Sequence, residues 1–133
     1  MKVTGAGILL INKYNNKQGR YELAFLIVRN RATGLYDDPG GTHDVVTQSP
    51  QSFKKTALRE LQEETFNLFK VSSSAISGKY LIEREYKSDR LYNSYILYID
   101  SPIRTRYYNH NYNLLIDNKK VPAPFKETNK VNF

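Results

Sequence analysis

Cysteine is absent from this 133-residue chain, and none of its apolar runs is long. Without a thiol, the chain has no disulfide scaffold, no cysteine nucleophile and no thiolate zinc site. The N-terminal residues lead into a short apolar stretch, residues 8–11, which lacks the length and the cleavage site of a signal peptide. No other stretch is long enough to cross a bilayer. We therefore expect a cytoplasmic protein with no membrane partner.

Acidic residues are fewer than basic ones, which gives a formal net charge of +7. The lysines and arginines are spread along the chain, so this charge indicates either a solvated basic surface or steering of a phosphate-rich substrate. A hydrophobic fraction of 40% indicates a folded protein, and the length suits a single domain, residues 1–133. The many Asn, Lys, Tyr and Ile residues are typical of an AT-rich genome, such as that of a parasite or of a large DNA virus, whose protein would act in the host cytoplasm.

Runs of β-branched and aliphatic residues alternate with polar segments, and no repeat divides them. The polar segments predict a loop over residues 29–46, a hairpin connection at residues 87–90 and a long loop over residues 104–120. Strands, then one helix, then further strands describe an α+β domain with a mixed sheet. The strands are expected at residues 3–11, 21–28, 79–86 and 91–99, with a last one beginning at residues 130–133.

A helix is predicted to start at Ser49-Pro50, because serine is a good N-cap and proline is tolerated at the first helical position. Its apolar residues recur on one side, which should pack on the core. Its acidic residues lie on an adjacent face, where we expect exposed carboxylates lining a cleft. The apolar set is Phe53, Ala57, Leu58 and Leu61, and the acidic set is Glu60, Glu63 and Glu64.

The acidic set belongs to the run Arg59-Glu60-Leu61-Gln62-Glu63-Glu64. Three carboxylates this close in a helix repel one another, so a counter-charge is needed. A divalent cation is the natural candidate, since Mg²⁺ binds carboxylate oxygens and is often shared with substrate phosphates. Upstream stands Asp38-Pro39-Gly40-Gly41, a turn that other groups can approach closely because glycine has no side chain.

Together the glycine turn and the acidic helix resemble the Nudix hydrolase signature. The resemblance covers residues 40–68 in detail, and the flanking strands agree with it coarsely. It implies a mixed β-sheet packed with the signature helix. Family members usually continue into a second helix beyond the point where this chain ends, so the resemblance also implies a trimmed chain or a compact variant without that helix.

The signature is not followed throughout. Between Gly41 and Arg59 the chain is four residues longer than the signature, and Gln51 replaces an expected glutamate. Asp44, three residues past the second glycine, is placed to compensate. Phe66 replaces the glycine that usually ends the motif, which leaves Asn67 as the best helix terminator.

By resemblance, the protein cleaves a diphosphate linkage with Mg²⁺ or Mn²⁺ and an attacking water. The metal ligands implied are Glu60, Glu63, Glu64 and the carbonyl of Gly41. Arg59 reaches Glu63 at i+4, either to orient it or as an ordinary surface pair. The general base is either Glu127, just before the last strand, or Glu63.

Substrate contacts are open at this point. His43 is placed to touch phosphate, with an ordinary loop histidine as the alternative. Tyr107 and Tyr108 are candidates to stack a nucleobase, with loop packing as the alternative. The substrates considered are capped RNA ends, dinucleoside polyphosphates, nucleoside diphosphate derivatives, deoxynucleoside triphosphates and diphosphoinositol phosphates. The alternative function is a noncatalytic Nudix-fold module that binds RNA or nucleotide.

Overall fold

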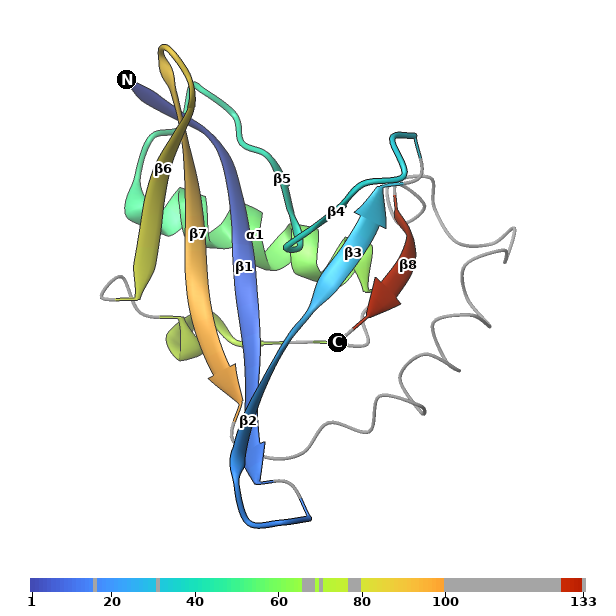
Figure 1. Cartoon of the computed structure of the whole chain (residues 1–133). Helices are drawn as coiled ribbons and strands as arrows, with labels where there is room; N and C mark the ends of the chain where they lie inside the picture. The colour runs from blue at the N-terminus through green and yellow to red at the C-terminus, as the bar shows by residue number, and fades with distance from the viewer. Residues whose placement is uncertain are drawn as a thin grey trace.

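The computed structural model describes residues 1–15, 17–30, 32–65, 69, 71–76, 80–99 and 128–132. These residues form two β-sheets and one long helix, α1 (Pro50–Glu64), with a 3-10 turn, η1 (Ser73–Ala75) (Figure 1). Within these ranges, no helix combines the length and the hydropathy required to cross a membrane. The mixed-sheet α+β architecture expected from the sequence is confirmed.

The larger sheet has five strands. Its order is β2-β1-β7-β6, and β5 pairs with β1 in addition. The pairing of β1 with β7 is parallel, whereas β1–β2, β1–β5 and β6–β7 are antiparallel. The sheet is therefore mixed, as predicted. The strands are β1 (Lys2–Asn15), β2 (Tyr21–Phe25), β5 (Gly40–Thr42), β6 (Leu81–Lys87) and β7 (Arg90–Ile99).

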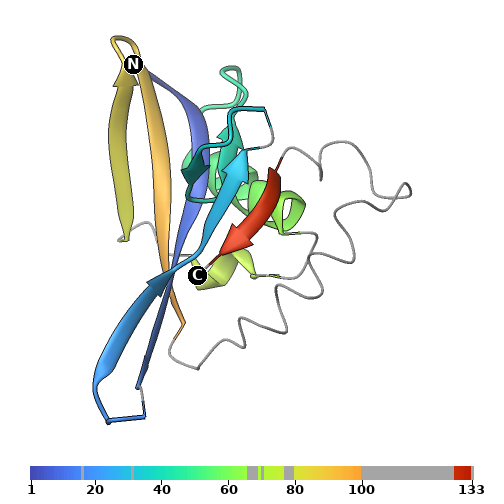
Figure 2. The ribbon, with the colours of Figure 1, turned by 45° about the vertical axis from the view of Figure 1, so that its right-hand side comes forward.

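A smaller sheet contains β4 (Tyr36–Asp37), β3 (Ile27–Asn30) and β8 (Thr128–Asn132), in that order. The prediction of one strand over residues 21–28 is wrong, because the strand divides at Leu26. Leu26 is fully buried, and its N–H donates to the carbonyl of Leu10 at 3.0 Å. This residue anchors the chain in the core while β2 continues as β3 into the other sheet, as Figure 2 shows.

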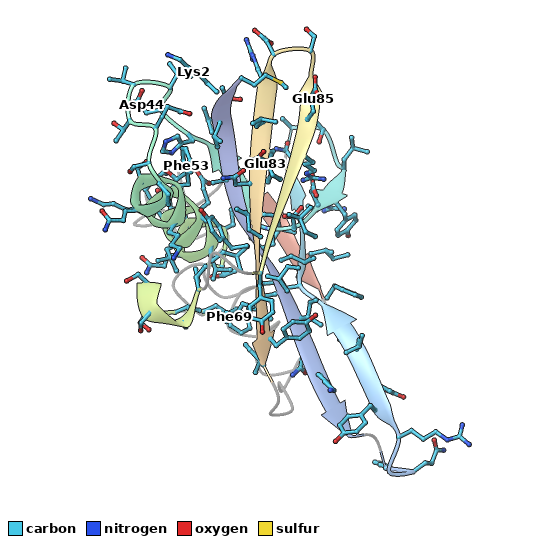
Figure 3. The ribbon with its side chains drawn as sticks, turned by 90° about the vertical axis from the view of Figure 1, so that its left-hand side faces the viewer. Lys2, Asp44, Phe53, Phe69, Glu83 and Glu85 are labelled. Atoms are coloured by element: carbon cyan, nitrogen blue, oxygen red, sulfur yellow. The ribbon has the colours of Figure 1, made fainter. Side chains whose placement is uncertain are left out.

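The helix packs on one face of the larger sheet (Figure 3). Ala57 and Leu61 are fully buried, and the other two residues of the predicted apolar face, Phe53 and Leu58, pack against the same core. The core on the sheet side comes from β1 and β7, whose alternating side chains face the helix. It includes Ala6, Ile8, Leu10 and Tyr95.

The predicted loop over residues 29–46 contains two short strands, β4 and β5. Gly40 and Gly41 carry little β-propensity, yet they pair, together with Thr42, with residues 5–7 of β1. Backbone pairing places the two glycines in the sheet. The helix ends at Glu64, with Thr65 as its C-cap. Asn67 and the predicted loop at 104–120 lie outside the described residues.

Replacing Ser49 by alanine should lower the free energy of unfolding by about 1 kcal/mol. The Ser49 hydroxyl accepts from the Ser52 N–H at 3.1 Å, and the Ser52 hydroxyl accepts from the Ser49 N–H at 3.1 Å. Urea denaturation measures the effect. Gln51→Ala, at an exposed position of the same first turn, is the matched control and should leave stability nearly unchanged. An equal loss in both variants would show that the cap contributes nothing specific.

Candidate metal-binding and catalytic site

The glycine turn lies directly against the acidic half of α1. The Gly40 N–H donates to a carboxylate oxygen of Glu64 at 3.1 Å. Gly41 packs against the Glu60 carboxyl group so closely that a Cβ at position 41 would collide with it. A side chain at this position would force the Glu60 carboxyl group to shift, so glycine keeps the turn and this carboxylate in close contact. The turn is fixed to β1 as well, because the Ile8 N–H donates to the carbonyl of Pro39 at 2.8 Å.

This contact buries two of the three acids. Glu60 is 5% exposed and Glu64 is 6% exposed, while the Glu63 side chain is 16% exposed. The expectation of exposed carboxylates is wrong, because the glycine turn covers the face on which they stand. Burial in a less polar environment strengthens every electrostatic interaction among these groups.

Arg59 contacts two of the acids. Its Nη1 donates to both carboxylate oxygens of Glu63 at 3.1 Å, and its Nη2 lies 3.1 Å from an oxygen of Glu60. The i+4 contact predicted from the sequence is therefore present. Arg59 supplies one positive charge to a face that carries three negative ones.

Carboxylate and carbonyl oxygens are the ligands that Mg²⁺ and Mn²⁺ prefer. The residues present fit such an ion by type and by charge: three carboxylates lie on one helical face, beside Gly41. As placed in the described part of the chain, no three acidic or histidine side chains converge on one point. Glu63 instead faces Arg59, and Glu64 faces the Gly40 N–H.

A second cluster, not found from the sequence, surrounds Asp38 at the start of the glycine turn. Its carboxylate accepts from the Ser94 hydroxyl at 3.3 Å and lies 3.5 Å from Arg84 Nη2. Burial, together with the neighbouring Asp37, raises the pKa of Asp38 to about 7. The hydrogen bond from Asp38 lowers the pKa of Asp37. The sequence signal that could have revealed this cluster is the pair of adjacent aspartates that precedes Pro39-Gly40-Gly41.

Tyr92 fills the space between this cluster and the glycines. Its ring and hydroxyl pack against Gly5, Gly7 and Gly40, where an added Cβ would collide with them. The guanidinium of Arg84 stands 4.7 Å from the centre of the Tyr92 ring. Nothing in the sequence pattern distinguished these two strand residues from their neighbours.

The ring contacts of His43 are with the loop before α1 and with the first half of α1. His43 is 4% exposed, its Nδ1 is 2.6 Å from the Thr56 hydroxyl and its Nε2 is 2.6 Å from the carbonyl of Thr47. With both ring nitrogens engaged, the geometry favours the ordinary loop-histidine interpretation. It joins the loop to the helix.

Two further sequence candidates, Asp44 and Gln51, lie in the described part of the chain and are not brought to the acids. Asp44 lies on the loop leading into α1 and accepts from the Val46 N–H at 2.9 Å (Figure 3). Gln51 stands in the first turn of α1, well before the acidic half. Glu127, Tyr107 and Tyr108 lie outside the described residues.

Solved structures of other proteins share this fold. A C. elegans Ap4A hydrolase in a binary complex is 18% identical, over 76% of this chain and 69% of that one, with a TM-score of 0.52. RenU, a Nudix hydrolase from M. smegmatis, is 17% identical, over 77% of this chain and 62% of that one, with a TM-score of 0.50. T. brucei MERS1, in a complex with RNA, is 19% identical, over 76% of this chain and 36% of that one, with a TM-score of 0.50.

These similarities show that the chain has the Nudix fold. No protein-family model matches the sequence, and no curated protein matches it. At this identity the likeness concerns the fold, so activity has to be argued from the site itself.

Asp38→Asn should change how stability depends on pH. Because the pKa of Asp38 is about 7 in the folded protein against 3.8 ordinarily, the folded state binds this proton more tightly than the unfolded chain does. The resulting stabilisation is full below about pH 4 and is lost as the pH rises through about 7. Asp37 adds little slope above about pH 5.5, where it is ionised in the unfolded chain and also in the folded protein, in which its pKa is lowered.

Urea denaturation of metal-free protein at about pH 5.5 and about pH 8 measures this change. The wild-type protein should lose stability between the two values, and D38N should lose less. Asp89→Asn, at a side chain that is 80% exposed, is the control and should behave like wild type. Parallel losses in wild type and D38N would contradict the assignment.

Proposed function

We propose that this protein is a divalent-metal-dependent hydrolase of a diphosphate linkage in a nucleotide-containing or other highly anionic substrate. The observation that carries the proposal is the packing of the glycine turn on the acidic face of α1. Glu60 and Glu64 are buried under this turn, and Glu63 lies on the same face of the helix. Burying carboxylates is costly unless they are paired, so their placement together supports a site that binds a cation.

The metal ligands in this proposal are Glu60, Glu63, Glu64 and the carbonyl of Gly41. When bound there, Mg²⁺ or Mn²⁺ would neutralise charge on the diphosphate oxygens and would lower the pKa of a bound water. The Gly40 N–H orients Glu64 through its hydrogen bond. Arg59 orients Glu63 through the paired contacts of its Nη1.

A carboxylate has to accept the proton of the attacking water. Glu63 is one candidate, because its contacts with Arg59 fix its direction. Glu127 is the other candidate, and it precedes β8, the strand that pairs with β3 at the edge of the smaller sheet. Comparing the pH–rate profiles of E63Q and E127Q would assign the base.

The substrate class follows from charge. A net charge of +7 attracts a phosphate-rich molecule, and the similar folds include a hydrolase of Ap4A. Capped RNA ends, dinucleoside polyphosphates, nucleoside diphosphate derivatives and diphosphoinositol phosphates all meet this requirement. Assays of these substrates with each metal would select among them.

A noncatalytic module that binds RNA or nucleotide is the second candidate. It is supported by Gln51 in place of the expected glutamate and by the fold shared with MERS1, which has been solved with RNA. Such a module would bind the same ligands without turnover.

Glu63→Gln and Glu64→Gln should each reduce turnover by a factor on the order of 10² or more while the protein stays folded. The amide oxygen of glutamine still accepts from Arg59 or from the Gly40 N–H, so the fold keeps its contacts and loses a charge. Initial rates with Mg²⁺ or Mn²⁺, beside circular dichroism, measure both effects. Glu83→Gln, at an exposed position of β6, is the control; near-wild-type rates in both site variants would exclude this site.

Added Mg²⁺ or Mn²⁺ should raise the melting temperature of the protein. Binding to the folded state stabilises it by about 1–3 kcal/mol when the ion is at tens to a hundred times its Kd. Glu60→Gln should shrink this shift, because it removes one of the charges that bind the ion. If melting is unaffected by either cation, with or without a nucleotide diphosphate, the noncatalytic module replaces the hydrolase.

A further inference from the structure

We propose that Arg84 and Tyr92 form a stacking platform for the nucleobase of the substrate, and that Asp37 beside them selects guanine. The inference rests on the proposed function, since it names the substrate of that site. It concerns a cavity of about 520 Å³ lined by Asp37, Gly41, Arg84, Glu85 and Tyr92. This volume lies in the range of small-molecule sites and admits a nucleoside.

The platform is held rigidly. The Tyr92 ring packs against Gly5, Gly7 and Gly40, so it has little freedom to move. The Arg84 guanidinium lies 4.7 Å from the ring centre and contacts the buried carboxylate of Asp38, which in turn accepts from Ser94. A group that is already fixed loses little conformational entropy when a ligand binds.

One face of the guanidinium meets Tyr92, and the side chain is still 47% exposed in the wall of the cavity. A planar arginine cation stacks well on an aromatic ring. Stacking of a base on such a group does not depend strongly on which base is present, because every base has a π-face. Stacking therefore accounts for the binding of a base. Selection of one base over another has to come from other groups that line the cavity, such as Asp37.

Charge excludes phosphate as the group bound on this platform. Arg84 is paired with Asp38, and two further carboxylates, those of Asp37 and Glu85, line the same cavity. An anion placed here would meet more negative than positive charge. A neutral ring that donates hydrogen bonds suits these surroundings.

Guanine provides such donors side by side. Its N1–H and its exocyclic amino group lie on one edge and match the two oxygens of a single carboxylate. Adenine presents an amino group next to an acceptor, and uracil presents one N–H between two acceptors. Asp37 is suited to accept because the Asp38 N–H donates to its carboxylate at 2.8 Å and stabilises the ionised form.

Gly41 links this cavity with the acidic site, because it lines the cavity and packs on Glu60. A nucleotide whose base stacks on Arg84 therefore has its phosphates next to the proposed metal ligands. The two halves of the substrate would bind to different chemistry: the base to the platform, and the diphosphate to the acidic face of α1.

Isothermal titration calorimetry with GDP, ADP, UDP, guanosine and inorganic diphosphate, each with Mg²⁺, tests the proposal. Wild-type protein should bind GDP at least about tenfold more tightly than ADP or UDP, and should bind guanosine weakly. Arg84→Gln should lower the affinity for GDP and for guanosine by about tenfold and should leave the affinity for inorganic diphosphate unchanged. Asp37→Asn should reduce the preference for GDP over ADP.

Arg90→Gln is the matched control. Arg90 stands on the same β6–β7 hairpin, is 48% exposed and contacts an exposed aspartate, so its loss should change no affinity. Equal weakening of GDP and inorganic diphosphate in R84Q would make Arg84 a phosphate-binding residue and overturn the proposal. So would the absence of a preference for guanine, or no binding of either GDP or guanosine. Guanosine binding without any diphosphate binding would instead contradict the hydrolase and leave the platform standing.

Discussion

The hydrogen bond from the Gly40 N–H to Glu64 joins the two parts of the molecule on which the site depends. One part is the short strand β5, which pairs with β1, and the other is the second half of α1. The close packing of Gly41 on Glu60 reinforces the same contact. A side chain at Gly41 would displace the Glu60 carboxyl group, and one at Gly40 would collide with Tyr92 and with the backbone of β1, so both glycines contribute to the packing of the turn.

This contact brings together two electrostatic environments. On the helix side, three carboxylates share one face with a single guanidinium, which contacts two of them, an arrangement that favours a bound cation. On the strand side, Asp38 is buried beside Arg84 and Ser94, and burial raises its pKa. The Asp38 carboxylate is paired with Arg84 within the protein, whereas the three helix carboxylates have one guanidinium among them. That difference is the reason to assign metal binding to the helix and base binding to the strand residues.

Parts of the site could be predicted from local spacing. The Arg59–Glu63 contact follows from an i+4 pair, and the cap at Ser49 follows from serine and proline preferences at helix starts. The apolar face of α1 also follows from the helical period. The division of a strand at Leu26 could not be predicted, because a run of apolar residues does not reveal where a chain passes from one sheet to another.

The sequence by itself determined the helix, the order of its charges and the glycine turn, because these depend on residues within a few positions of one another. Only the tertiary structure decided which acids are buried, that both nitrogens of His43 are engaged, and that Arg84 and Tyr92 stand beside the turn. The contacts responsible join residues far apart in the chain: 24 positions for Gly40 and Glu64, and 56 for Asp38 and Ser94. Strand register and burial set such contacts, and both are properties of the whole fold.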